Sequence, residues 1–416
     1  MSMSPDDSRI TREVDRQMVL LSRGAVQIIS EEELAKKLRR SLLSKKPLRV
    51  KLGVDPTAHD LHLGFTLPLS KLQLFSELGH RPVLIIGDAT AMVGDPTGKN
   101  AARPKLDHDT VRDFAKSYLD QAGRVLDMDR VEVRWNSEWL TRLGFQELIA
   151  LMSRSTVARM LERDDFSKRH REGVPIYIHE FLYPLLQGHD SVVVEADVEL
   201  GGQDQLFNLL VGRDLQVQAG QEPQVCMMGP LLVGLDGHRK MSKSYGNYIG
   251  VNEAANEMFG KVMSLSDETM RTWFELLTCV PQEEIERLFE GDTHPRELKD
   301  RLAREIVTRF HGKEAAAAAS EEFRRVFANK ELPSDIPEAV VPEEALGAEG
   351  IRLTRLLTLL GLAPSNKEAR RLVEQGGVRV DDDVIRDPAS EITPQGGEVL
   401  RVGKKRFVKL VVNRMK

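Results

Sequence analysis

The stretch Asp60-Leu61-His62-Leu63-Gly64-Phe65 contains the first residues whose types and spacing suit phosphate chemistry. The apolar run Leu48–Val54 before it predicts a strand. After it, apolar residues recur every three or four positions, which predicts a helix. A junction from strand to helix presents free backbone N–H groups and the positive helix end to an anion. There His62 would donate a hydrogen bond to a phosphate, and Gly64 would let the ligand approach the backbone. A surface histidine beside a turn glycine is the alternative, and this stretch alone does not decide between the two.

A second stretch, Lys240-Met241-Ser242-Lys243-Ser244, follows a turn at residues 236–239. Two ammonium groups and two hydroxyls on one loop can gather around a polyphosphate, and they add positive charge where a leaving phosphate becomes more negative. Loops rich in lysine are more often simply solvated. Together with the strand–helix junction upstream, however, this loop predicts a nucleotide site.

A third group lies on one predicted helix. Tyr183, Gln187 and Asp190 are four and three residues apart, so they share one face. A polar trio on an otherwise apolar helix indicates that something polar binds there. Other polar residues follow the predicted strands directly: Asp55 and Thr57, then Asp95, Lys99 and Arg103, then Gly202, Asp204 and Gln205.

The elements that must position these residues alternate between strand and helix. The strand-like runs are Leu48–Val54, Pro82–Ile86, Val131–Trp135, Ser191–Val198 and Gln224–Met228, with long amphipathic segments between them. This alternation predicts an α/β fold with a mainly parallel sheet covered on both faces. Ligands in such sheets bind beyond the carboxyl ends of the strands, where the polar groups are found.

The 416 residues suit two or three domains. We expect a helical segment at 1–46, the α/β domain at 47–250, an all-helical domain at 251–330, a linker rich in proline and acidic residues at 331–350, and a small module at 351–416. Ser30 and Glu33 form a capping box that begins a helix in the first segment.

Composition sets further limits. The net charge of −5 is uneven, because residues 350–416 hold fourteen Lys and Arg against eight Asp and Glu. A basic tail suggests a polyanionic partner, although a solvated face is the plainer explanation. Cys226 and Cys279 lie in apolar surroundings without metal-type spacing, so we expect free buried thiols and no metal site. With a polar, acidic start and no long apolar run, we expect neither signal peptide nor membrane span, and a cytoplasmic protein.

The first two stretches resemble the HIGH and KMSKS signatures of class I aminoacyl-tRNA synthetases. The chain between them resembles bacterial tyrosyl-tRNA synthetases, at Asp55-Pro56-Thr57, Gly94–Lys99, the Tyr183 trio and Gly201–Gln205. Residues 369–380 resemble the S4-type RNA-binding module that ends those enzymes. The resemblance runs from about residue 20 to the end of the chain. It implies a Rossmann-like parallel-sheet catalytic domain, then an all-α domain and a small α+β S4-like domain.

The resemblance also implies an activity. L-tyrosine would be activated by ATP with Mg²⁺ and passed to the 3′ end of tRNA(Tyr), in a homodimer without a tightly bound cofactor. The implied catalytic residues are His62, Thr57, Lys240 and Lys243. The implied ATP contacts are Gly64, Phe65, Gly202, Asp204, Met241, Ser242, Lys243 and Ser244, with Lys99 and Arg103 linked to the phosphates. The implied tyrosine contacts are Gly53, Asp55, Asp95, Tyr183, Gln187, Asp190 and Gln205. Arg370, Arg371 and Arg379 would bind RNA.

Two positions depart from the family pattern. Phe65 occupies the place of the last histidine of the HIGH signature, so one ATP contact is lost unless a neighbour such as Thr66 replaces it. Lys51 stands where many relatives have a tyrosine that touches the phenol hydroxyl of the substrate.

Two alternatives stay open at this point. One is a sister enzyme that charges tryptophan, although those enzymes lack the S4-type tail and Asp190 suits a hydroxyl better than an indole. The other is an RNA-binding protein that has lost catalysis, which only Phe65 favours.

Overall fold

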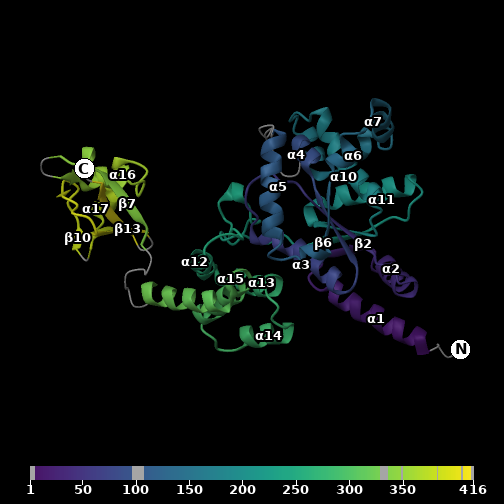
Figure 1. Ribbon diagram of the computed structural model, residues 1–416, viewed down its shortest axis with the longest axis horizontal. Helices are drawn as coiled ribbons and strands as arrows, with labels where there is room; N and C mark the ends of the chain where they lie inside the picture. The colour runs from purple at the N-terminus through teal and green to yellow at the C-terminus, as the bar shows by residue number, and fades with distance from the viewer. Residues whose placement is uncertain are drawn as a thin grey trace. The chain divides into compact units, whose positions relative to one another are not determined.

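The computed structural model describes residues 5–95, 107–327, 336–347, 350–381, 383–403 and 406–413, so Lys99 and Arg103 lie outside the described residues. The chain forms two compact units, Met1–Ser320 and Glu321–Lys416. Each unit has its own layers of helix and strand (Figure 1) and is described by itself.

The first unit is built around a six-stranded sheet in the order β1-β6-β5-β2-β3-β4. Its strands are β1 (Gln27–Ile29), β2 (Arg49–Val54), β3 (Arg81–Ile86), β4 (Glu132–Trp135), β5 (Val198–Gly202) and β6 (Val225–Gly229). All neighbours pair in parallel except β1, which pairs antiparallel with β6. From β2 the chain proceeds to β3 and β4 on one side, and later to β5 and β6 on the other. The strand order therefore reverses between β2 and β5, which is where open α/β sheets bind ligands.

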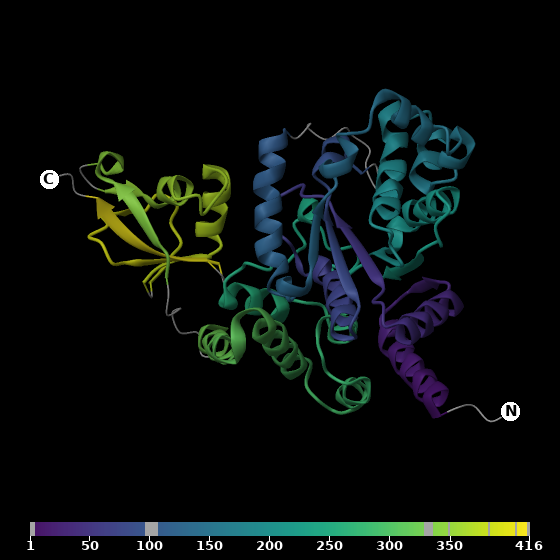
Figure 2. The ribbon, with the colours of Figure 1, turned by 45° about the vertical axis from the view of Figure 1, so that its right-hand side comes forward.

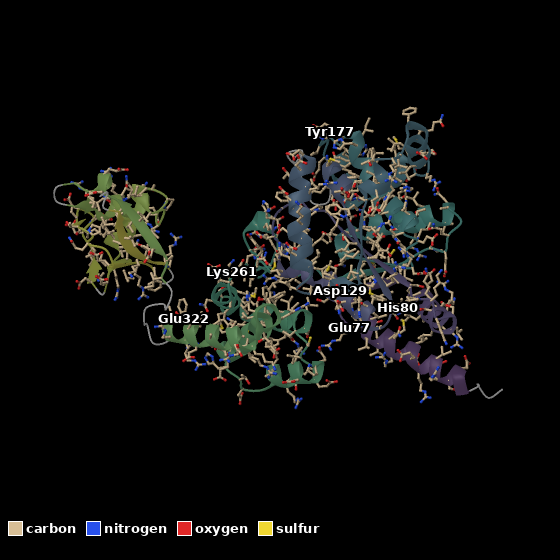
Figure 3. The ribbon with its side chains drawn as sticks, in the orientation of Figure 1. Glu77, His80, Asp129, Tyr177, Lys261 and Glu322 are labelled. Atoms are coloured by element: carbon tan, nitrogen blue, oxygen red, sulfur yellow. The ribbon has the colours of Figure 1, made fainter. Side chains whose placement is uncertain are left out.

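Helices cover both faces of this sheet, with α5 (His108–Ala122) on the left of it and α10 (Leu182–Val193) and α11 (Leu206–Gln218) on the right in Figure 2. Figure 3 draws the side chains between these layers. Leu72 and Phe75 of α3 (Leu63–Glu77) are fully buried. The helices of this part are α1 (Pro5–Ser22), α2 (Glu31–Ser44), α3 (Leu63–Glu77), α4 (Asp88–Val93), α5 (His108–Ala122), α6 (Ser137–Leu140), α7 (Phe145–Met152), α8 (Val157–Met160), α9 (Asp164–Arg171), α10 (Leu182–Val193) and α11 (Leu206–Gln218), with short 3₁₀ turns η1 (Met128–Arg130), η2 (Ile178–Phe181), η3 (Gln203–Gln205) and η4 (Lys243–Tyr245).

From Ala255 to Phe327 the elements are all helices, as the sequence predicts for the region 251–330. They are α12 (Ala255–Met263), α13 (Asp267–Leu277), α14 (Gln282–Glu290) and α15 (Pro295–Phe327). The last is two helices joined at Gly312, whose φ of 87° no helix accommodates.

Helices α10 and α11 approach each other closely where Gly188 faces Gly212. A Cβ atom on Gly188 would lie 3.1 Å from the backbone nitrogen of Gly212 and 2.9 Å from a methyl carbon of Leu215. Glycine costs about 1 kcal/mol relative to alanine inside a helix. Here it lets the backbones of the two helices come together at this point.

Some local predictions are confirmed and others are wrong. The Ser30 side chain accepts a hydrogen bond from the Glu33 backbone at 3.2 Å, as a capping residue does. The predicted strand Ser191–Val198 is wrong, because its first residues complete α10 and the strand begins only at Val198. A short run of valines fits a helix end as well as a strand. Cys226 is buried, but the expectation of a buried Cys279 is wrong, since that residue is exposed.

The second unit packs two helices against small sheets. Its elements are β7 (Glu338–Pro342), η5 (Glu343–Ala345), β8 (Ile351–Arg352), α16 (Leu353–Leu359), α17 (Asn366–Glu374), β9 (Val378–Val380), β10 (Asp383–Ile385), β11 (Glu391–Ile392), β12 (Val399–Val402) and β13 (Arg406–Asn413). The five-stranded sheet has the order β10-β9-β12-β13-β7. Residues 338–342, which we expected in a linker, form β7 and pair in parallel with β13. Among the described residues, each helix is too short or too polar to cross a bilayer.

Candidate functional site

His62 lies at the carboxyl side of β2 and is the N-cap of α3. Its Nδ1 accepts a hydrogen bond from the backbone N–H of Gly64 at 3.2 Å, so Nε2 carries the proton and can donate. A Cβ atom on Gly64 would lie 3.0 Å from the imidazole ring, which explains the glycine. Burial, followed by the charges of Lys243 and Lys240, lowers the pKa of His62 to about 4. His62 is therefore a neutral donor at physiological pH.

Phe65 lies in the first turn of α3. Its ring centroid lies 4.8 Å from that of His62 and 6.4 Å from that of Tyr118. Thr66 is fully buried and donates to the carbonyl of Leu63 at 2.7 Å. The hydroxyl of Thr66 is therefore engaged within the helix, so its suggested role as a substitute for the missing imidazole is wrong.

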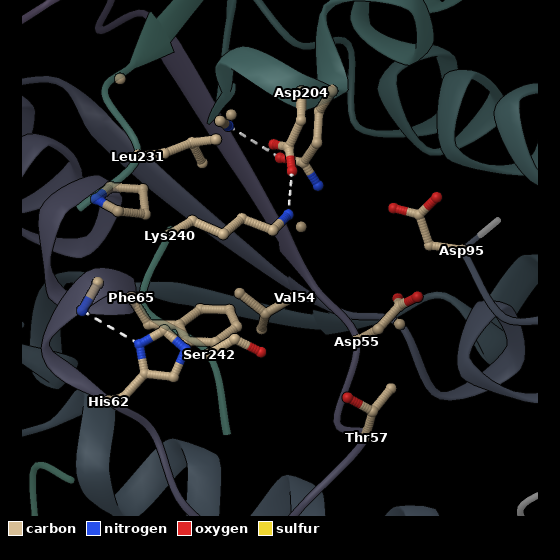
Figure 4. A pocket seen from close by; sticks show the side chains of 18 of the residues that line it. Val54, Asp55, Thr57, His62, Phe65, Asp95, Asp204, Leu231, Lys240 and Ser242 are labelled. Carbon is tan, nitrogen blue, oxygen red and sulfur yellow. Dashed lines mark hydrogen bonds and ion pairs between the residues drawn. The ribbon is translucent and has the colours of Figure 1, made fainter. Parts of the chain in front are cut away.

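The loop at residues 240–244 reaches the two junctions that follow β2 and β5. The Lys240 ammonium forms an ion pair with Asp204 at 2.8 Å, and the Lys243 ammonium donates to the backbone carbonyl of Asp60. Figure 4 shows Lys240 extending to Asp204 above the rings of His62 and Phe65. The two stretches that the sequence singled out lie far apart along the chain but contact each other directly in the fold.

Asp55 follows β2 and faces the opposite part of the site. It accepts hydrogen bonds from the hydroxyls of Tyr183 and Thr90, each at 2.8 Å. Asn136 in turn donates to the Thr90 hydroxyl at 2.9 Å. A Cβ atom on Gly87 would come within 2.0 Å of the Asp55 carboxylate, so only glycine fits there. Burial and the nearby carboxylates raise the pKa of Tyr183, which keeps its phenol protonated as a donor.

Asp190 is a buried carboxylate, 3% exposed, on the same face of α10. It accepts hydrogen bonds from Trp139 Nε1 at 2.8 Å and from Asn136 Nδ2 at 3.2 Å. Burial raises the pKa of Asp190 to about 7, against the lowering effects of Lys51 and these two donors. A carboxylate held this way remains a strong acceptor for one more donor, such as a hydroxyl.

Gln187 and Asp95 are held by neighbours that the sequence did not indicate. The Gln187 amide accepts from Asn208 at 2.9 Å and donates to Glu199 at 3.1 Å. The Asp95 carboxylate accepts from Arg163 at 2.9 Å.

Lys51 is the second position at which the chain departs from the family pattern. It is 0% exposed, and its ammonium donates to Glu199 at 2.9 Å, to Ser191 at 2.7 Å and to the carbonyl of Gln187 at 2.9 Å. Lys51 therefore lies behind α10 as part of a buried ion pair.

One cleft of about 490 Å³ brings these groups together. The predicted residues that line it are Gly53, Asp55, Thr57, His62, Gly64, Phe65, Asp95, Tyr183, Gln187, Asp190, Gly202, Asp204, Gln205, Lys240, Met241, Ser242, Lys243 and Ser244. They come from the carboxyl ends of β2, β3 and β5, from α10 and from the loop after β6.

Sequence reasoning missed Thr90, Asn136, Trp139 and Arg163. The signal for the first three was their place shortly after β3 and β4, where polar residues meet the site. No such signal marks Arg163 in the sequence, because it precedes helix α9 and does not follow a strand. Only the packing of the fold brings it to the site.

Arg370, Arg371 and Arg379 lie in the second unit and are exposed. Arg371 forms an ion pair with Glu368 at 2.5 Å. In the part of the chain that the structure describes, no three His, Cys, Asp or Glu side chains gather to hold a metal ion.

Comparison with known proteins agrees with this geometry. The family model for class I tRNA synthetases (W and Y) matches residues 43–328, and that for the S4 domain matches residues 351–399. The chain belongs to the class I tRNA synthetases. Within this family it is 54% identical to the tyrosine–tRNA ligase of Symbiobacterium thermophilum over 403 residues, which cover 96% of this chain and 98% of the relative. It is 52% identical to that of Moorella thermoacetica over 406 residues, or 97% of each chain.

The fold of this class I synthetase is also similar to solved structures. The mitochondrial tyrosyl-tRNA synthetase of Aspergillus nidulans, truncated at its C-terminus, aligns with a TM-score of 0.63 at 22% identity, over 77% of this chain and 98% of the other. The Archaeoglobus fulgidus enzyme complexed with L-tyrosine aligns with a TM-score of 0.60 at 23% identity, over 74% and 99%. These structures confirm the predicted α/β fold class.

Proposed function

We propose that this class I synthetase is a tyrosine–tRNA ligase that activates L-tyrosine with ATP and transfers it to the 3′ end of tRNA(Tyr). The observation that carries the proposal is the arrangement of one cleft. A buried hydroxyl acceptor, Asp190, lies at one end, and a neutral histidine with two lysines lies at the other.

The tyrosine end of the cleft offers hydrogen-bond acceptors for both polar ends of the substrate, the phenol hydroxyl and the ammonium group. Asp190 would accept the phenol hydroxyl, and phenylalanine would leave that carboxylate unpaired, an effect for which tyrosyl-tRNA synthetases are themselves the usual example. Asp95, Tyr183 and Gln187 would surround the ammonium group, because a cation needs charged or carbonyl acceptors. Asp55 would hold Tyr183 in place, and Gly53 and Gln205 would line the walls.

The nucleotide end carries the ammonium groups of Lys240 and Lys243 beside the Asp204 carboxylate. Gly64 and Gly202 would allow close approach of ATP, and Asp204 would accept from the ribose. Met241, Ser242 and Ser244 would complete the wall. Lys99 and Arg103 are proposed phosphate contacts by family resemblance alone.

The first step needs no general base, because the tyrosine carboxylate is already ionised. It attacks the α-phosphate, and pyrophosphate leaves. His62, Thr57, Lys240 and Lys243 would stabilise the charge that develops on the phosphates, so catalysis is mainly positioning and electrostatics. Mg²⁺ would enter with the nucleotide, since it binds in proteins largely through substrate phosphates and water. The loop at 240–244 would move, because Lys240 must leave Asp204 when the ribose arrives.

The remaining parts of the chain would serve tRNA. The helices of residues 251–330 would read the anticodon, and the basic module at 351–416 would hold the backbone through Arg370, Arg371 and Arg379. We also propose a cytoplasmic homodimer. The segment 145–178 supports an interface, because it exposes the large apolar side chains of Phe145, Ile149, Val157, Tyr177 and Ile178.

Amino-acid-dependent exchange of pyrophosphate into ATP tests this function. We expect exchange with tyrosine, and at least about 10³-fold less with phenylalanine, because a site built around a hydroxyl rejects the analogue that lacks it. Faster exchange with tryptophan would favour the sister activity. Absence of exchange with every amino acid would favour an RNA-binding protein without catalysis.

A further inference from the structure

A chain of buried hydrogen bonds runs behind the cleft, from β5 to the residue before α9. Arg163 donates to Asn208 Oδ1 at 3.2 Å, Asn208 donates to Gln187 Oε1 at 2.9 Å, and Gln187 donates to Glu199 Oε1 at 3.1 Å. Asn208 is 1% exposed and Arg163 is 5% exposed. Neither lines the cleft, but each touches a residue that does.

The residues at the two ends of this series of hydrogen bonds fix which group donates and which accepts in every bond of it. Arg163 can only donate. Glu199 forms an ion pair with the Lys51 ammonium, so its carboxylate can only accept. Both amides between them are thereby oriented, since reversing either one would place two donors or two acceptors face to face. Gln187 must keep its Oε1 on the side of Asn208.

Arg163 also holds Asp95, the second side chain that is proposed to bind the ammonium group of the substrate. Its Nη2 contacts Asp95 at 2.9 Å while its Nε contacts Asp165 at 2.8 Å, and its guanidinium lies 5.2 Å from the centre of the Phe166 ring. One planar guanidinium can serve these partners and Asn208 at once because its donors are spread around a rigid fork. The Arg163 guanidinium therefore orients both the Asp95 carboxylate, directly, and the Gln187 carbonyl, through Asn208.

We propose that Asn208 and Arg163 are positioning residues, which hold the Gln187 amide and the Asp95 carboxylate as one acceptor set for the ammonium group of the amino-acid substrate. This inference rests on the proposed function and adds to it. Asn208 and Arg163 do not touch the substrate. They orient the acceptor atoms that bind the ammonium group of the substrate.

The test separates the ammonium group from the rest of the ligand. Dissociation constants are measured for L-tyrosine, for tyramine, which keeps the ammonium group but lacks the carboxylate, and for 3-(4-hydroxyphenyl)propanoate, which lacks the ammonium group. In Asn208→Ala we expect tyrosine and tyramine to bind about tenfold more weakly, as for a lost hydrogen bond to a charged group, and the propanoate to bind unchanged.

Arg163→Lys is the second variant. It keeps the positive charge beside Asp95, so the fold is retained, but it loses the fork that joins Asp95 to Asn208. We expect the same selective loss. Gln216→Ala is the matched control, because Gln216 is 1% exposed on the same helix as Asn208 but its side chain bonds backbone groups of Ser191, Ala196 and Gln224. Its melting temperature should fall while all three dissociation constants stay constant.

Two results would overturn the inference: equal weakening of all three ligands in both variants, or no change in any of them. Failure of the proposed function gives a different result. In that case the unaltered protein would bind no tyrosine and show no tyrosine-dependent exchange.

Discussion

Phe65 is the residue at which this chain departs most clearly from the HIGH signature. Its ring lies against His62 and Tyr118 and also packs against the main core. The chain thus keeps one neutral imidazole donor at the proposed nucleotide end and has an apolar ring where the HIGH signature has a second imidazole.

Restoring the second imidazole should strengthen ATP binding. In Phe65→His we expect the KM for ATP to fall by up to about tenfold, the value of one neutral hydrogen bond. Some apolar burial is lost, so the free energy of unfolding should fall by about 1 kcal/mol. Exchange kinetics against ATP concentration and urea unfolding measure the two effects. Phe65→Leu is the control, since it removes the ring without adding a donor. An unchanged KM in the histidine variant would mean that ATP does not reach this position.

The proposed role of Asp190 makes tyrosine recognition depend on pH. Burial raises its pKa to about 7, so the carboxylate becomes protonated as the pH falls from 8 to 6. A protonated carboxyl accepts a phenol hydroxyl more weakly than a carboxylate does. We therefore expect the KM for tyrosine to rise as the pH falls through 7, and Asp190→Asn to abolish this dependence while raising the KM at pH 8. A flat profile in the unaltered protein would contradict the assignment.

The raised pKa of Asp190 also makes the stability of the fold depend on pH, and the direction of this dependence follows from the shift. The folded-state pKa of Asp190 lies above its ordinary value of 3.8, so the folded protein binds more protons than the unfolded chain between these values. The contribution of Asp190 to stability is complete below pH 4 and is lost as the pH rises through 7. His62 and His80, whose pKa values fall from 6.5 to about 4, act in the opposite direction. Their contribution is complete above pH 6.5 and is lost as the pH falls toward 4.

At the scale of elements, the ion pair of Lys51 and Glu199 joins the two strands between which the strand order reverses. The two residues are direct partners in the parallel register of β2 and β5. Both side chains are almost completely buried, at 0% and 1% exposed. Breaking such a pair leaves one charge without compensation, which is costly even where the intact pair adds little net stability.

We therefore expect Lys51→Met to lower the free energy of unfolding by about 3–5 kcal/mol. Lys51→Met combined with Glu199→Gln should cost clearly less than the sum of the two single changes, because no unpaired charge remains. Urea unfolding of the four proteins in the cycle measures this. Additive effects would show that the two side chains do not interact. Exposed Lys36→Met, which breaks a surface pair with Glu32, is a control expected to change stability by less than about 1 kcal/mol.

Much of the architecture could be predicted from local pattern. The capping box at Ser30, the helix after the HIGH-like stretch and the helix ending before Gly376 each depend on neighbours within a few residues. The contacts of Asn136, Trp139, Arg163 and Lys51 could not be predicted this way. They join residues whose proximity depends on strand order and helix packing, and a buried lysine looks the same in sequence as a solvated one. Of the candidate site, the sequence indicated most of the groups that line the cleft, although not Thr90, and it did not indicate Asn136, Trp139 and Arg163, which hold them from behind.

At the scale of the whole molecule, the residues of the cleft and the proposed RNA-binding arginines belong to different compact units. Amino-acid activation and tRNA binding should therefore be separable by mutation. Arg370 and Arg379 are exposed in the basic second unit, whereas Arg371 is already paired with Glu368.

In Arg370→Ala with Arg379→Ala we expect unchanged tyrosine-dependent exchange and weaker tRNA binding. The slope of log K against log salt concentration should become less steep by about 2, since each phosphate contact contributes about 0.9. Arg371→Ala is the comparison, with a smaller expected change. Filter binding of tRNA across salt concentrations gives the slopes. A loss of exchange in the double variant would argue against separate roles.

The glycine pair between α10 and α11 has a consequence for how substrate preference can change. Gln187 precedes Gly188 directly, and Asn208 lies one turn before Gly212, so the gap between the helices also sets the length of their hydrogen bond. A methyl group at Gly188 would lie 3.1 Å from the backbone nitrogen of Gly212 and would push the two helices apart by a few tenths of an ångström. That displacement is comparable to the whole range of lengths over which such a hydrogen bond keeps its strength. A lineage or an engineer could therefore retune amino-acid selectivity by altering the spacing of two helices, with every residue that faces the substrate left as it is.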